Sequence, residues 1–131
     1  MTDHAAHGDG ESDKRVTYDL ADRTARLGEA IIKFARSVRL DPITSPLVSQ
    51  LVRAATSVGA NYSEANDANS KKEFLYRISL CSREVRETKH WLRMLAIAYP
   101  IRKEQARVLW KESHELNLIF NAIYRKGKSK P

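Results

Sequence analysis

Residues 70–99, SKKEFLYRISLCSREVRETKHWLRMLAIAY, decide the predicted fold class. Ser70 with Glu73 three residues later forms a capping box, in which the Ser70 side chain accepts from the Glu73 amide at a helix start. Apolar or small residues then recur at alternating steps of four and three up to Pro100, which is typical of one side of an α-helix. They are Phe74, Ile78, Cys81, Val85, Thr88, Leu92, Leu95 and Tyr99.

The same rhythm predicts three further helices. One runs over residues 20–40 with Asp19 as its N-cap. Another starts at Ser45-Pro46, a capping residue followed by a proline that suits the first helical position. A last one spans residues 102–125, with Gly127 as its stop. Four apolar seams with short connections predict an all-α fold, an antiparallel up-and-down four-helix bundle over residues 18–126.

The chain ends differ from this body. Residues 1–17 are polar and aperiodic, and we expect a disordered N-terminal tail there. Residues 127–131 form a short basic C-terminal tail. No apolar run approaches the roughly 18 residues of a membrane span, so no membrane partner is expected. No secretory signal precedes the helices, and the single cysteine, Cys81, forms no internal disulfide, so a cytoplasmic location is expected.

Charge points towards an acidic partner. The formal net charge is +7, and because residues 1–15 hold four acids and two bases, the rest of the chain carries +9. A basic body attracts nucleic acid, although solubility alone would also explain it. On the helix over residues 71–99, a turn of about 100° per residue gathers the bases into one stripe. Its members are Lys72, Arg83, Arg86, Lys89 and Arg93.

A second, largely apolar arc of this helix lies outside the core seam. It holds Tyr76, Leu80, Trp91 and Met94 with the edge acids Glu84 and Glu87. Together the two apolar arcs span about 200°, wider than the roughly 100° of a typical surface helix. Another helix of the same bundle would cover this arc, or another subunit would. We expect a homo-oligomer, with Tyr76, Leu80, Trp91 and Met94 at the interface.

Polar residues near core positions have three readings. Ser57, Asn61 and Glu64 share one helix face, and with Glu84 and Glu87 they predict an interhelical polar network that sets register. A ligand or nucleic-acid site is the second reading. A metal site is the third, but only one Glu-x-x-His spacing occurs, Glu87 to His90, and no metal ligands, cofactor or catalytic residues are predicted. Cys81 lies on the core face without a base at fixed spacing, so the expectation is a protein that is not an enzyme.

Three motifs in order carry a family resemblance. They are Ser57-Val58 with Asn61 and Glu64, then Ser70-Lys71-Lys72-Glu73-Phe74, then Glu84-x-x-Glu87 before Trp91-Leu92. Over residues 18–125 the chain resembles the 23S rRNA intervening-sequence proteins. The resemblance implies a short bundle that assembles as a ring-like homo-oligomer, with a pentamer as the expected form. Related bundles are accessory proteins of retroelement reverse transcriptases, in which a basic ring surface contacts nucleic acid.

Two functions follow as hypotheses. The first is a non-enzymatic oligomeric accessory protein that binds RNA or DNA and works beside a reverse transcriptase or another protein. Its expected phosphate contacts are Arg83, Arg86, Lys89 and Arg93 with Arg125, Lys126, Lys128 and Lys130. The second is a protein–protein adaptor or scaffold without nucleic-acid binding. Salt-sensitive binding to RNA or DNA distinguishes the two, because phosphate contacts release counterions.

Overall fold

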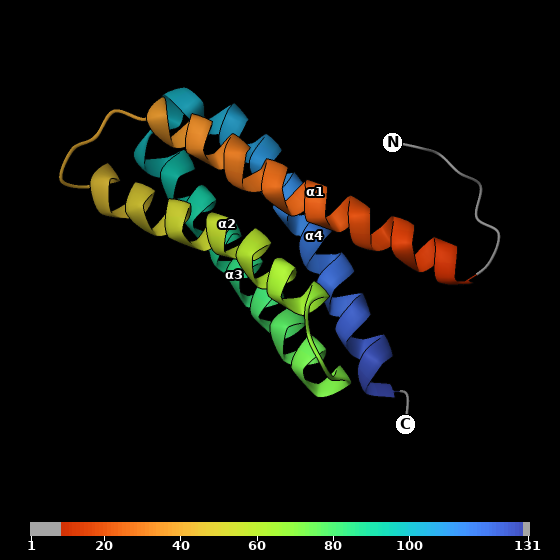
Figure 1. Cartoon of the computed structure of the whole chain (residues 1–131). Coiled ribbons are helices and arrows are strands. Elements are labelled where there is room, and N and C mark those ends of the chain that lie inside the picture. Colours follow the sequence, from red (N-terminus) through yellow and green to blue (C-terminus); the bar gives the residue numbers. More distant parts are fainter. Residues whose placement is uncertain (1–8, 130–131) are drawn as a thin grey trace.

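The computed structural model describes the backbone of residues 9–129 and the side chains of residues 19–129. The described chain forms four α-helices, namely α1 (Asp9–Arg36), α2 (Thr44–Asn66), α3 (Lys71–Ala98) and α4 (Lys103–Ser129). A 3₁₀ turn, η1 (Pro100–Arg102), links α3 to α4. Successive helices run in opposite directions, as Figure 1 shows. The predicted all-α four-helix fold is confirmed.

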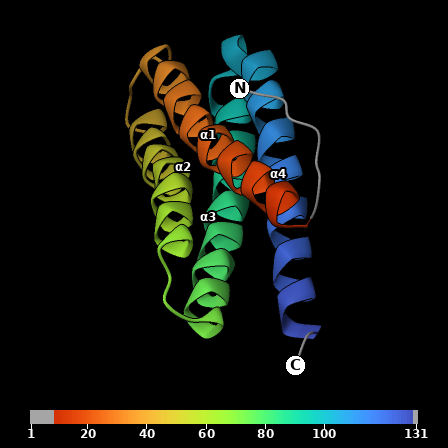
Figure 2. The same cartoon turned by 45° about the vertical axis from the view of Figure 1, so that its right-hand side comes forward.

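The bundle packs mainly around α3. Both α2 and α4 lie against α3 along much of their length, whereas α1 packs on α2 and contacts α4 less extensively. Figure 2 shows α1 crossing obliquely in front of the other helices. The α1–α2 loop and η1 meet at one end of the bundle, which we call the closed end. There Nε of Arg102 donates to Oγ of Ser37 at 3.0 Å.

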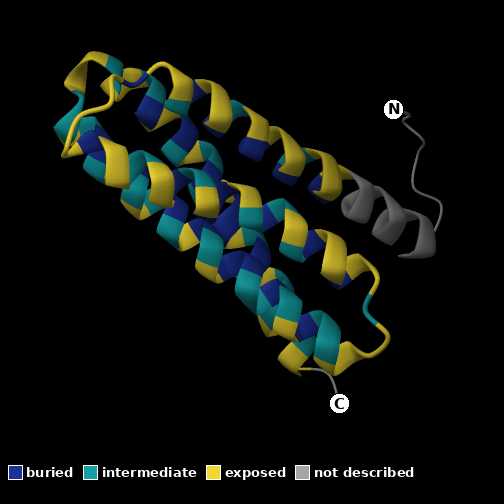
Figure 3. Cartoon of the chain, turned by 60° about the vertical axis from the view of Figure 1, so that its left-hand side comes forward, coloured by how far each residue is buried: buried dark blue, intermediate teal, exposed yellow. Residues whose placement is uncertain are grey.

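The core coincides with the predicted seams. In α1, buried residues recur at steps of four and three, and Figure 3 shows such inward stripes in dark blue. They include Leu20, Thr24, Leu27, Ile31 and Phe34. Phe120 of α4 is fully buried, and its ring lies 6.1 Å from that of Tyr62 in α2. Burying apolar surface stabilises the fold by about 25 cal/mol per Å². The burial of this shared core is therefore the main interaction that holds the helices together.

Both bounds of the first helix differ from the prediction. Residues 1–8 of the predicted tail lie outside the described residues, but α1 already begins at Asp9 rather than near Leu20, and it ends at Arg36. The apolar period in the sequence begins at Leu20, so it gave no signal for the preceding turns. The predicted helix start near Leu20 was therefore too late.

Helix α2 begins at Thr44 with Ile43 at the N-cap position, so the predicted cap, Ser45, lies inside its first turn, and Asp41 of the preceding loop binds the first amides. A carboxylate oxygen of Asp41 accepts from the amides of Ile43 and Thr44, both at 2.8 Å. These bonds, that from Thr44 first, lower the pKa of Asp41 because they favour its charged form. The Thr44 hydroxyl donates to the Arg39 carbonyl at 2.7 Å and ties the loop down. The predicted cap was wrong because a carboxylate just upstream already satisfies the first amides.

The predicted start of α3 is confirmed. The Ser70 side chain accepts from the Glu73 amide at 3.1 Å. Glu73 reaches back, but its carboxylate accepts from the amide of Asn69, at 3.3 Å, rather than from that of Ser70. One free amide of the helix start, that of Glu73, and the amide of Asn69 just before the cap are thereby satisfied.

Gly127 does not stop the last helix, which continues to Ser129. A Cβ atom at Gly127 would lie 2.5 Å from Cδ2 of Leu75, so the glycine permits a close approach of α4 to α3. The predicted helix stop was wrong, because Gly127 serves the packing of α4 on α3 and does not cap the helix. No helix within residues 9–129 combines the length and the apolar character that crossing a membrane requires.

Candidate nucleic-acid interface

Two acids of α3, Glu84 and Glu87, are turned towards α2. Arg53 of α2 donates from Nη1 to Glu84 at 3.3 Å and also pairs with Glu87. The Glu84 side chain is only 13% exposed, so this pairing satisfies a largely covered carboxylate. Arg53 therefore takes up the negative charge on this side of α3.

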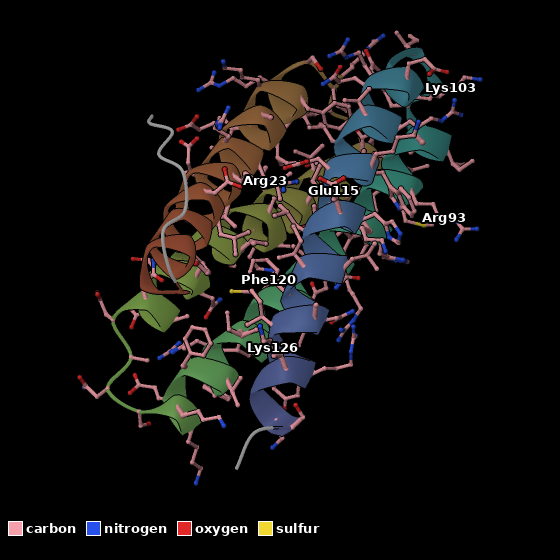
Figure 4. The ribbon with its side chains drawn as sticks, turned by 90° about the vertical axis from the view of Figure 1, so that its right-hand side faces the viewer. Arg23, Arg93, Lys103, Glu115, Phe120 and Lys126 are labelled. Atoms are coloured by element: carbon pink, nitrogen blue, oxygen red, sulfur yellow. The ribbon has the colours of Figure 1, made fainter. Side chains whose placement is uncertain are left out.

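Two acids of α4, Glu112 and Glu115, are turned towards α1. Arg23 donates from Nε and Nη2 to the two carboxylate oxygens of Glu112, at 3.1 and 2.9 Å, and from Nη2 to Glu115 at 2.7 Å. Figure 4 shows Arg23 and Glu115 pointing towards each other across α1 and α4. The hydrogen bond to Glu112 raises the pKa of Arg23 most, which outweighs the lowering effect of burial. Two anions are thus gathered around one cation, away from α3.

What remains outside is a basic surface along α3 and α4. On α3 the bases of this surface occupy a sector of about 120° that contains no acid and leaves Arg77 outside. On α4 they occupy a sector of about 100° that also contains no acid and leaves Lys126 outside. Glu104 borders the α4 sector and pairs with Arg107 at 3.3 Å. We call this surface the α3–α4 face. Its bases are Lys72, Arg83, Arg86, Lys89, Arg93, Lys103, Arg107, Lys111, Arg125 and Lys128.

A polar seam joins the two halves of this face. Ser82 donates to Oδ1 of Asn121 at 2.6 Å, and its hydroxyl accepts from Nδ2 of Asn117 at 3.1 Å and from Arg86 at 3.2 Å. Further along, Nζ of Lys89 lies 2.9 Å from Nδ1 of His114. These contacts fix α3 and α4 side by side, so the bases of both helices share one surface. Ser82 and Asn117 were not among the predicted residues. Each is a buried polar residue that lies next to apolar core residues on its helix.

A groove opens in the α3–α4 face near the closed end of the bundle, with a volume of about 560 Å³. Trp110 forms part of its wall, and we call it the Trp110 groove. Its remaining wall is aliphatic, from Leu92, Ala96, Ile97 and Ala106, and its rim is basic, from Arg93, Lys103, Arg107 and Lys111. Figure 4 shows Arg93 and Lys103 on the same side of the molecule. The groove adds an apolar recess to a surface that is otherwise charged.

The predicted phosphate contacts divide into three groups. Six lie on the α3–α4 face: Arg83, Arg86, Lys89, Arg93, Arg125 and Lys128. Lys126 is exposed but lies about 140° around α4 from Lys103, towards the α1 side. Lys130 lies outside the described residues. The sequence analysis missed Lys103, Arg107 and Lys111, which come together with α3 only through the packing of α4.

The predicted polar network is two separate contacts. Besides the Arg53 pairs, Asn61 accepts from Nη1 of Arg77 at 3.4 Å and donates to the Ser57 carbonyl at 3.0 Å. The Ser57 hydroxyl donates to the Arg53 carbonyl of its own helix, at 2.7 Å. Glu64 is exposed on the surface of α2. Arginines, which the prediction left out, hold the interhelical contacts together.

The four predicted interface residues are unequally placed. Tyr76 is 57% exposed. Leu80, Trp91 and Met94 are each half-buried within the single chain, and Trp91 packs against its core. Arg53 of α2 reaches Glu84 and Glu87 in the second apolar arc of α3. Helix α2 therefore covers part of the arc from which a second subunit was predicted. The combined width of the two apolar arcs therefore does not by itself require another copy of the chain.

Cys81 is buried in the core, and its thiol lies 3.7 Å from the Val58 carbonyl. Burial raises its pKa to about 12, so the thiol stays protonated at neutral pH. Nucleophilic chemistry needs the thiolate, which this environment disfavours. Among the residues whose side chains are described, no three His, Cys, Asp or Glu side chains gather as metal ligands would.

Comparisons with known proteins place this bundle in a family. Residues 17–122 match the family model described as 23S rRNA-intervening sequence protein. A crystal structure from Bacteroides thetaiotaomicron, described as a protein with unknown function from the S23 ribosomal protein family, superposes with a TM-score of 0.72. It is 24% identical, and the match covers 83% of this chain and 97% of that one, which supports the fold. No curated protein matches the chain. The chain belongs to the 23S rRNA-intervening sequence protein family.

Proposed function

We propose that this protein is a non-enzymatic accessory factor that binds RNA or DNA through the phosphates that contact its α3–α4 face. The observation that carries the proposal is the separation of charge. Arg53 and Arg23 pair with acids of α3 and α4 on the sides that face α2 and α1, and the basic sectors of α3 and α4 hold no acid. A surface of one sign attracts a polyanion and speeds its association.

The chemistry of this face fits backbone binding rather than sequence reading. Most of its bases, such as Arg83 and Arg93, are exposed. Lysine and arginine contacts to phosphate oxygens carry no base identity, so the expected affinity depends on salt much more than on sequence. The proposal assigns no substrate, cofactor or bond-making step to the protein.

The proposal includes a homo-oligomer, with a ring-like pentamer as its form. A closed ring repeats the same face on every subunit, and several weak phosphate contacts then act together on one strand. Exposed Tyr76 on α3 is the residue of the predicted interface that remains free to meet a second copy. A reverse transcriptase or another cytoplasmic protein is the proposed partner of the assembled nucleic-acid complex.

The proposal is tested by comparing two charge-reversal variants, one on the α3–α4 face and one on α1. The variant Arg83→Glu/Arg86→Glu/Arg93→Glu changes the α3–α4 face, and Arg26→Glu/Lys33→Glu/Arg36→Glu makes the same change in net charge on exposed positions of α1. The first is expected to weaken binding of a labelled RNA or DNA strand at least about tenfold. The second is expected to have a much smaller effect. Equal losses from both variants would show attraction to net charge rather than to this face.

A protein–protein adaptor is the second candidate, and the closed end favours it. Ile97 and Ile101 are among the most exposed aliphatic side chains of the described residues, and Leu40 and Ile43 are exposed in the neighbouring loop. Apolar groups gathered at one end of a bundle are typical of a contact surface. An adaptor would show no salt-dependent binding to RNA or DNA.

A further inference from the structure

The Trp110 groove differs from the rest of the basic face because its wall is apolar and aromatic. Its volume of about 560 Å³ is within the roughly 300–1,000 Å³ of typical ligand sites. Leu92 and Ile97 contribute aliphatic wall, and Arg93 and Lys111 stand at the rim. Phosphates alone would need only the rim, so the apolar wall calls for a second chemical group on the same ligand.

Trp110 is held in a fixed position at this groove. Its ring stacks on the His114 imidazole, with centroids 5.0 Å apart and planes 11° apart. Nζ of Lys89 lies 4.9 Å from the centre of the Trp110 ring and hydrogen-bonds His114. A side chain fixed in this way loses little conformational freedom when a flat ligand packs on it.

We infer that the Trp110 groove receives an unpaired base of a nucleic-acid strand, while the rim cations contact the adjoining phosphates. The inference rests on the proposed function and adds a ligand class, single-stranded RNA or DNA. Charge complementarity selects this occupant: the rim of the groove holds four basic side chains, no acid lines the groove, and Glu104 beside it already pairs with Arg107. Sites for single strands combine such a basic track with an aromatic side chain that stacks on bases. Bases of a duplex are already stacked and paired, so they do not enter.

The test compares a labelled strand of about 20 nucleotides with the same strand annealed to its complement, a length above typical single-strand sites. Binding of both probes is measured by fluorescence anisotropy at one salt concentration. The full-length protein is expected to prefer the single strand. Trp110→Leu keeps an apolar wall but removes the aromatic plane. It is expected to weaken single-strand binding about tenfold and to change duplex binding less than about twofold.

A matched pair of surface variants guards against a folding defect in Trp110→Leu. Ile97 and Ile101 are 79% and 80% exposed, but only Ile97 lines the groove. Ile97→Glu is expected to reduce single-strand affinity at least about fivefold more than Ile101→Glu, because it puts a carboxylate where the base and its phosphates lie. Circular dichroism checks that both variants retain their helices.

The outcomes separate this inference from the proposed function. If the wild type binds neither probe at low salt, the proposed function fails and the inference fails with it. If the wild type binds both probes but Trp110→Leu and Ile97→Glu affect them equally, or affect neither, the basic face still binds nucleic acid and the inference is overturned. The groove would then suit another ligand, such as an acidic segment of a partner protein.

Discussion

Gly127 of α4 and Leu75 of α3 are so close that a Cβ atom on the glycine would lie 2.5 Å from Cδ2 of the leucine and 3.2 Å from Cδ1. Alanine at a helical position ordinarily stabilises by up to about 1 kcal/mol relative to glycine. At Gly127 this gain is offset, because the buried Leu75 must move to make room. Gly127→Ala is therefore expected to leave the free energy of unfolding unchanged or lower it, as measured by urea denaturation.

Gly28 of α1 provides the matched control. A Cβ there would meet its nearest atoms, in Thr56 and Ala55, at 3.8 to 3.9 Å, which is an ordinary contact. Gly28→Ala is expected to stabilise the protein by about 0.5–1 kcal/mol. An equal gain at both positions would show that α4 does not depend on the close approach at Gly127.

The Arg53–Glu84 pair is expected to show a measurable coupling. Glu84 is largely covered, while Arg53 is about half exposed, so screening reduces the expected coupling energy to about 0.5–1 kcal/mol. A double-mutant cycle of Arg53→Gln and Glu84→Gln measures it through the free energy of unfolding. The exposed pair of Arg26 and Asp22, four residues apart in α1, serves as comparison, with a coupling expected below about 0.5 kcal/mol. Indistinguishable coupling in the two cycles would contradict the interhelical role of Arg53.

Cys81 is expected to make stability depend on alkaline pH. Below about pH 9 the thiol is protonated in both the folded and the unfolded chain and contributes no pH dependence. Between about 9 and 12 the unfolded thiol ionises while the folded one, with its raised pKa, does not. The free energy of unfolding should therefore fall with rising pH, by up to about 1.4 kcal/mol per pH unit.

Subtracting the same pH series of Cys81→Ala isolates this effect from lysine and tyrosine titration. A thiol reagent provides a second readout: native protein is expected to react slowly at neutral pH and the urea-unfolded chain rapidly. Fast labelling of the native protein, or identical pH profiles for both proteins, would contradict the burial of this thiol.

Self-association is expected to involve Tyr76. Tyr76→Glu introduces a charge at a side chain that is 57% exposed, so it should spare the fold of the single chain and lower the mass of the assembly. Val108→Glu is the control, because Val108 is 59% exposed on α4. Light scattering measures both masses. If the wild type is a single copy at high concentration, or if both variants retain its mass, Tyr76 is not at an interface.

Periodicity was enough to predict four helices and their inward faces, because a residue such as Ile78 or Leu92 repeats the rhythm of the helix that it belongs to. Periodicity failed to predict helix ends that depend on contacts with residues elsewhere in the chain. Gly127 has the composition of a helix stop, and only the neighbouring Leu75 explains why it lies within a helix. Asp41 accepts from the first amide of α2, and the Thr44 hydroxyl holds the preceding loop in place through the Arg39 carbonyl.

The part of the candidate site that lies on α3 could be predicted from the sequence, but the part formed by α3 and α4 together could not. The stripe of Arg86 and Arg93 follows from their spacing in α3 alone. The contribution of Lys103 and the Trp110 groove depends on how α4 lies against α3, which contacts such as Ser82 with Asn117 determine. Sequence periodicity describes each helix separately and contains no information on that pairing.

The central claim is that phosphates bind the α3–α4 face, and the salt dependence of affinity tests it most directly. For a duplex probe, the slope of log K against log salt is about −0.9 for each neutralised phosphate. The variant Arg83→Gln/Arg86→Gln/Arg93→Gln is expected to reduce the size of that slope by up to about 3 relative to the wild type, whereas Arg26→Gln/Lys33→Gln/Arg36→Gln on α1 should leave it unchanged. A slope near zero in the wild type, or the same reduction in both variants, would contradict the claim.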